Sequence, residues 1–234
     1  MVFFKQQVFF AWLLSLLCIG LLVLSIPRFV ASLYALYPES VLSQHQYNLP
    51  AEIYLNSIKA LDDALVWDDN PEYWQAKSLC YLALLNSPST SNIEKRLLLI
   101  QARQSIMSGL AGSPIDEFAW FRLAVINNTL GFQVNDALRL SLYSAPVEPE
   151  LIMQRLQLAY SYEADLSAEE RALWLKQVKI AWKLKPKELV SFVIENPTAK
   201  AWFETGFYND AEQLDQFRQT YDKATQKIIA APSR

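Results

Sequence analysis

Few residues in this chain have side chains that commonly carry out catalysis or bind metals. It holds one histidine, His45, and two cysteines, Cys18 and Cys80. With His45 alone, we expect no Ser-His-Asp or Cys-His arrangement and no histidine-rich metal site. Five glycines in 234 residues, with no G-x-G-x-x-G or G-x-x-x-x-G-K motif, leave no loop to hold a phosphate. The sequence therefore predicts no cofactor, no metal and no enzymatic activity.

Paired carboxylates are the remaining candidates for catalysis. A pair of carboxyl groups can hydrolyse a glycosidic bond, so an envelope-associated enzyme or enzyme subunit acting on glycans stays as an alternative function. Three of the four pairs lie beside expected helix ends, where a carboxylate near a helix start stabilises the helix dipole instead. The pairs are Asp62-Asp63, Asp68-Asp69, Asp116-Glu117 and Glu169-Glu170. Five arginines are spread across the expected helices, and most of them are expected to be solvated. They are Arg96, Arg103, Arg122, Arg139 and Arg155.

The composition describes a folded chain that binds no nucleic acid. Apolar residues make up 52%, and the formal net charge is −3. The first value excludes a disordered chain, and the second disfavours binding to a polyanion.

An uncharged apolar stretch lies near the N-terminus, between Lys5 and Arg28. As a helix it would be roughly 30 Å long, the thickness of a bilayer core. We expect a membrane anchor at residues 1–36 and a linker at 37–49. A cleaved signal peptide remains an alternative, with Val30-Ala31-Ser32 as a weak site, although its apolar region would run only about 7–15 residues. A lipoprotein signal at Cys18 is disfavoured because no small residue precedes it.

Basic residues flank the anchor sparsely. Lys5 and the α-amine lie before it, Arg28 lies just after it, and the next basic residue is Lys59. The positive-inside rule then favours a cytoplasmic N-terminus. We expect a single-pass protein of the inner (cytoplasmic) membrane whose C-terminal domain lies in the periplasm.

The rest of the chain reads as all-α. Apolar residues recur at helical spacing, and good helix formers dominate. Ser91-x-x-Glu94 and Ser167-x-x-Glu170 match capping boxes, and Pro71, Pro114 and Pro186 suit the first turn of a helix. The expected helices span residues 50–68, 71–86, 91–110, 114–130, 134–144, 149–163, 167–184, 186–194, 197–205 and 208–228.

Two internal similarities suggest a repeat. Prolines 71, 114, 149 and 186 recur at a period typical of helix-pair solenoids. A small residue followed by a large apolar one begins five residues before each of Pro114, Pro146 and Pro186. These pairs are Gly109-Leu110, Ser141-Leu142 and Ala181-Trp182. In addition, the stretch from Gly131 to Ala137 resembles the stretch from Gly206 to Ala211. There the glycine suits a tight turn and Asn-Asp suits a helix cap.

These residues resemble the tetratricopeptide repeats. Trp120-x-x-Leu123-Ala124, Gly131, Ala137 and Pro149 follow that family's order, while Trp74, Ser78 and Tyr81 follow its first half. The middle of the pattern appears at Trp202, Gly206, Tyr208 and Ala211. The resemblance implies an α-solenoid of antiparallel helix pairs over residues 50–228, followed by a tail at 229–234. An irregular helical bundle is the alternative.

A solenoid of this kind binds peptides or protein surfaces on its concave side. The first helices of two expected pairs would line that groove. The candidate partner-binding residues are Glu72, Gln75, Leu79, Leu82, Phe118, Phe121, Val125 and Asn128.

The anchor and the repeat together predict a non-catalytic adaptor that scaffolds a cell-envelope complex through protein partners. Size and layout also resemble bacterial exopolysaccharide biosynthesis accessory proteins of the Vibrio polysaccharide type, which implies a role in exopolysaccharide assembly or export. A passive structural anchor without a specific partner is the third hypothesis.

Overall fold

The computed structural model describes residues 2–44, 49–87 and 91–230, with backbone alone for residues 2–11. Within these ranges the chain is helical and contains no strand. It divides into two compact units, Met1–Ile115 and Asp116–Arg234. The all-α prediction is confirmed for the described residues.

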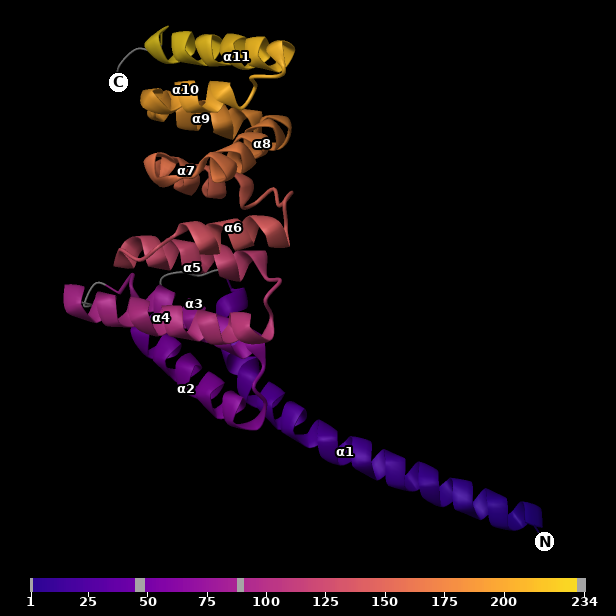
Figure 1. Ribbon diagram of the computed structural model, residues 1–234. Coiled ribbons are helices and arrows are strands. Elements are labelled where there is room, and N and C mark those ends of the chain that lie inside the picture. The colour runs from indigo at the N-terminus through magenta and orange to yellow at the C-terminus, as the bar shows by residue number, and fades with distance from the viewer. Residues whose placement is uncertain (1, 45–48, 88–90, 231–234) are drawn as a thin grey trace. The chain divides into compact units, whose positions relative to one another are not determined.

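The first unit is built from four helices (Figure 1). They are α1 (Val2–Ser43), α2 (Ala51–Trp67), α3 (Pro71–Leu84) and α4 (Asn92–Gly112).

The second unit is built from seven α-helices and two short 3-10 helices. They are α5 (Glu117–Leu130), α6 (Asn135–Ser144), α7 (Ile152–Ser161), η1 (Glu163–Asp165), α8 (Ala168–Leu184), α9 (Pro186–Glu195), η2 (Pro197–Ala199), α10 (Lys200–Thr205) and α11 (Ala211–Ala230).

The apolar N-terminal helix continues into the folded part of the chain without a break. Helix α1 extends to Ser43, so the first seven residues of the expected linker at 37–49 are helical, while 45–48 lie outside the described residues. Ala31, Ala35 and Val41 are buried in one cluster with Ile58 and Leu61 of α2. This packing stabilises helix in a segment that the sequence pattern assigned to a linker, because buried apolar contacts outweigh local propensity.

Most helix ends form as the sequence predicts. In both capping boxes the serine Oγ accepts from the backbone N–H three residues on, and the glutamate reaches back to the serine N–H: Ser91 with Glu94 and Ser167 with Glu170. Pro71 and Pro186 occupy first-turn positions. Pro114 does not, because α5 begins after Asp116, whose Oδ1 accepts from Ala119 N at 2.7 Å. An N-cap carboxylate accepts a hydrogen bond from an otherwise unpaired N–H of the first helical turn, whereas a proline there merely has no N–H that needs a partner.

Small residues bring the end of one helix close to the start of the helix before it. A Cβ atom placed on Gly109 of α4 would lie 3.0 Å from the Pro71 carbonyl oxygen at the start of α3. In the second unit, Ser141 of α6 donates its hydroxyl to the Glu117 carbonyl at the start of α5, at 2.7 Å. Helices α3 and α4 therefore run antiparallel, as do α5 and α6.

The two similar glycine stretches fold differently. Gly131 ends α5 with a left-handed φ of 77°, as expected for a turn glycine. Gly206 has an ordinary right-handed conformation, and a Cβ atom there would lie 2.7 Å from Val178 Cβ. Asp210 caps α11 through Gln213 N, while Asn135 lies inside α6. The likeness between the stretches is thus not a structural equivalence.

Aromatic side chains hold the C-terminal part of the second unit together. Trp202 and Phe203 of α10 stack with Tyr160 of α7, and Phe207 contacts Trp182 of α8 and Phe217 of α11. Trp202, Phe203, Phe207 and Phe217 are buried. Such aromatic pairs contribute about 0.5–1.5 kcal/mol each beyond their buried area.

Candidate functional site

The paired carboxylates have structural partners. Asp62 forms an ion pair with Lys77, which ties α2 to α3. Asp69 accepts the indole N–H of Trp74 at 2.6 Å. Asp116 caps α5, and the Glu170 carboxylate accepts from the Ser167 backbone N–H in the capping box of α8. One carboxylate of each pair therefore takes part in a contact that stabilises the fold.

The other candidates for chemistry are inert or lie outside the described ranges. His45 falls outside them. Cys80 is fully buried on α3, and burial raises the pKa of its thiol to about 12. A buried protonated thiol is a poor nucleophile. Among the described residues no group of three or more His, Cys, Asp or Glu side chains could hold a metal ion.

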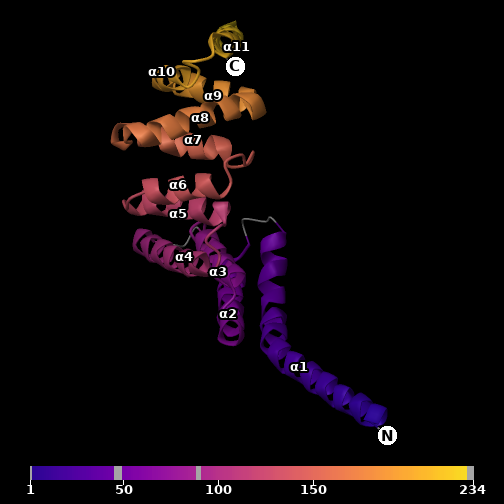
Figure 2. The same cartoon turned by 45° about the vertical axis from the view of Figure 1, so that its right-hand side comes forward.

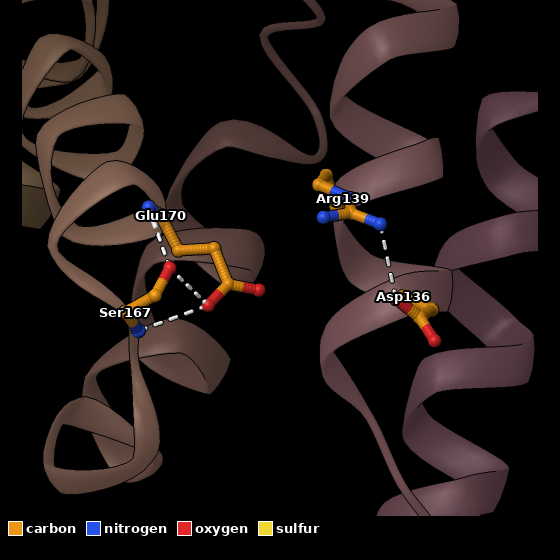
Figure 3. A network of polar contacts seen from close by, with 4 residues as sticks. All are labelled: Asp136, Arg139, Ser167 and Glu170. Carbon is orange, nitrogen blue, oxygen red and sulfur yellow. Dashed lines mark hydrogen bonds and ion pairs between the residues drawn. The ribbon is translucent and has the colours of Figure 1, made fainter.

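One small cavity opens between α6 and α8, with a volume of about 210 Å³. Its polar walls are Arg139, Tyr143, Ser167, Glu169, Glu170 and Lys176. Figure 3 shows that Arg139 pairs with Asp136 on its own helix, and that the Glu170 carboxylate is held by Ser167. Hydrogen bonds from the Ser167 backbone and hydroxyl lower the pKa of Glu170. Arg139 and Glu170 are therefore held by contacts within their own helix or helix cap, and no ligand chemistry is singled out.

Arg155 lies in the core of the second unit, contrary to the expectation of solvated arginines. Its side chain is 1% exposed. Its guanidinium donates to Ser141 Oγ at 2.9 Å, Ser141 O at 2.7 Å and Ala145 O at 2.8 Å. The two carbonyls end α6, so Arg155 of α7 caps the preceding helix. Because the Ser141 hydroxyl bonds to α5, this cluster links three consecutive helices.

The predicted groove residues fall into two sets, one in each unit. On α3, Glu72 and Leu79 are exposed, while Gln75 and Leu82 are half-buried. A Cβ atom on Gly109 would lie 3.0 Å from Gln75 Cγ, so Gln75 packs against α4.

The second set lies on α5. Val125 and Asn128 are exposed, Phe118 is half-buried and Phe121 is buried. The Asn128 side chain accepts a hydrogen bond from the Tyr162 hydroxyl. Each predicted face therefore offers some open positions, and others are occupied by packing inside its own unit.

Helix α4 carries an exposed apolar ridge that the sequence analysis missed. We define the α4 ridge as Ile93, Leu97, Ile100 and Met107, all exposed on the side of α4 away from its buried residues. With Gln104 and Ala111, these positions follow a spacing of four, three, four, three and four residues. That spacing is typical of a helix that pairs with another helix. The pattern was masked because the opposite face of α4 is also apolar.

Helix α1 carries a long run of exposed apolar residues between Trp12 and Ile26. The segment Trp12–Ser43 is long and apolar enough to cross a membrane, with a mean hydropathy of 2.3 and none of its most apolar window buried. A soluble core helix with this composition would be buried, since burial of apolar area is what stabilises it. Length and exposure together make α1 a candidate membrane span.

No protein-family model matches this chain, and no curated protein matches it significantly. Function is therefore argued from the molecule itself.

Proposed function

We propose that the protein is a non-catalytic, membrane-anchored helical-repeat adaptor. The observation that carries this proposal is α1, whose exposed apolar part runs directly into the segment packed on α2. A helix of this kind fixes the first unit close to a bilayer. The carboxylates described above form contacts that stabilise the fold, the Cys80 thiol is buried, and the cavity between α6 and α8 shows no catalytic arrangement. These features fit a binding protein better than an enzyme.

The repeat part of the proposal is a tetratricopeptide-like α-solenoid. Antiparallel pairing of α3 with α4 and of α5 with α6 supports it, as do the small residues Gly109 and Ser141 at matching contacts. In a solenoid each pair buries its faces against its neighbours, and a terminal helix presents a polar outer side. Helix α11 fits such an end, because Phe217 is the one fully buried side chain among its described residues.

The docking surface that we propose is the α4 ridge, and its occupant is an amphipathic helix of a protein partner. The 3.5-residue period of the ridge matches the knobs-into-holes spacing of helix pairs. Gln104 near the middle of the ridge would fix the register, as a polar residue does in paired helices. The open positions of the predicted groove, such as Leu79 and Val125, remain secondary candidates.

We further propose that the anchor lies in the inner membrane, with the helical units in the periplasm and a cell-envelope complex as the partner. The charges at Lys5 and Arg28 support this orientation through the positive-inside rule. The narrower proposal of exopolysaccharide assembly or export rests on layout alone.

Topology and partner contact can be tested in the same cells. Reporter domains fused after Arg234, one active only outside the cytoplasm and one only inside, should show outside activity. A photo-crosslinking amino acid at Leu97 should give a discrete adduct with one envelope protein. The matched control places the same group at Gln219, an exposed position on α11.

The outcomes separate the parts of the proposal. Activity of the inside reporter would reverse the orientation. Equal adducts at Leu97 and Gln219, or none at Leu97, would remove the α4 ridge as the docking surface. With the crosslinker kept at position 97, an Ile100→Glu change should abolish the adduct while the helical circular dichroism is kept, because Ile100 is 43% exposed.

A further inference from the structure

The apolar part of α1 is longer than a bilayer requires. The uncharged residues 6–27 measure about 33 Å as a helix, which already spans a hydrocarbon core of about 30 Å. Beyond Arg28 the helix continues to Ser43, which adds about 22 Å at the same rise per residue. This second part must lie outside the core of the membrane.

The second part of α1 has two different faces. Ala31, Ala35 and Val41 are buried in the cluster with α2. The opposite side carries Phe29 and Leu36, which are 64% and 59% exposed. We define the juxtamembrane face as Phe29, Leu33, Leu36 and Tyr37, all of which are exposed large apolar or aromatic residues.

If α1 stayed perpendicular to the membrane beyond Pro27, most of the juxtamembrane face would lie in water. The headgroup layer on one side of a bilayer is about 5–7 Å thick. Tyr37 lies ten residues beyond Pro27, or about 15 Å if the helix stays perpendicular to the membrane. The face can enter the interface along its whole length only if the helix leans toward the membrane plane after Pro27.

The structure contains such a bend. Figure 2 shows α1 bending between its N-terminal part and the part beside α2. Pro27 lies within the helix and cannot donate a backbone hydrogen bond, which is a common cause of kinks.

We propose that the juxtamembrane face lies in the headgroup region of the membrane leaflet at which the α1 span ends, with phospholipid as its occupant. Continuity with the span favours lipid, because the same helix delivers this face to that leaflet. Phe29 and Tyr37 suit the interface, where aromatic side chains concentrate. The first acidic side chain of this part, Glu39, comes only after the face ends. The inference rests on the proposed membrane anchor, and it adds that the first unit lies against the membrane instead of standing off from it.

Nitroxide labels on the full-length protein test this proposal. The background variant is Cys18→Ala, and Cys80 stays because its buried thiol, with a pKa near 12, should take up no label. Single cysteines replace Leu33 or Leu36 in the face, Ile19 in the span and Ile93 on α4. The protein is reconstituted in vesicles of phosphatidylethanolamine and phosphatidylglycerol. Power saturation then compares collisions with oxygen, which partitions into lipid, and with a water-soluble nickel chelate.

We expect labels at positions 33, 36 and 19 to collide more with oxygen than with the chelate, and a label at 93 to show the reverse ratio. Labels at 33 and 36 that behave like the one at 93 would overturn the inference and leave the anchor intact. Low collision with both reagents at 33 and 36 would also overturn it, because protein would then cover the face. A label at 19 that collides mainly with the chelate would refute the anchor itself.

Discussion

Replacing Arg155 by lysine should destabilise the second unit more than replacing it by methionine. The pKa of Arg155 falls from 12.5 to about 10 because burial penalises its charged form, which corresponds to roughly 3 kcal/mol of uncompensated desolvation. Methionine removes that penalty together with the donors. The Ala145 carbonyl then loses its guanidinium partner, whereas Ser141 O keeps the Ala145 N–H at 3.4 Å.

The two variants therefore differ in what they leave behind. Arg155→Met loses roughly 2–4 kcal/mol of hydrogen bonding, and relief of desolvation offsets most of that, for a net effect within about 1 kcal/mol. Arg155→Lys keeps a buried charge but lacks the planar fork that reaches Ser141 and Ala145 together, so we expect a loss of roughly 2–4 kcal/mol.

Hydrogen–deuterium exchange of the full chain in detergent measures this effect locally. For amides in residues 135–161, Arg155→Lys should speed exchange by about 30–700-fold and Arg155→Met by less than about fivefold. Arg139→Met is the matched control on α6, where an exposed ion pair with Asp136 is worth at most about 1 kcal/mol. A tolerated lysine together with a strongly destabilising methionine would refute the reasoning, since retained charge rather than fork geometry would then stabilise the cluster.

Three further outcomes follow from close packing, helix capping and burial. Gly206→Ala should destabilise the second unit by about 1–3 kcal/mol, because the new Cβ meets Val178 at 2.7 Å. Adding Val178→Ala should recover part of this loss in urea titrations, and additive effects would contradict a steric cause. The pKa of the Glu170 carboxyl is lowered in the folded state. The ionised carboxylate therefore contributes its full amount to the free energy of unfolding above the ordinary pKa of about 4.5, and this contribution is lost as the pH falls through the lower folded-state pKa. Glu170→Gln should flatten the fall in stability below that pH, and an unchanged acid limb would count against the cap. Finally, Cys80 should react with a thiol reagent at pH 8 only in denaturant, because burial holds its pKa near 12; rapid labelling of native Cys18→Ala protein would mean that α3 opens readily.

Local residue patterns determined where helices begin and end. The serine-glutamate boxes at Ser91 and Ser167 formed as predicted, as did the first-turn prolines of α3 and α9 and the left-handed cap at Gly131. These features depend on hydrogen bonds and backbone angles within a few residues, so a short stretch of sequence contains the cause. The apolar N-terminal stretch is visible for a similar reason, since length and composition decide it.

Contacts between distant residues decided the rest. The residues that follow Gly206 resemble those that follow Gly131, yet the role of Gly206 is set by Val178 on α8. Arg155 has no local sign of burial, and its acceptors lie on another helix. The α4 ridge was hidden because both sides of that helix are apolar, and only the packing of its buried side against neighbouring helices reveals which one stays exposed. Sequence periodicity gives the spacing of a face, whereas which face is covered depends on the helices that the tertiary fold brings beside it.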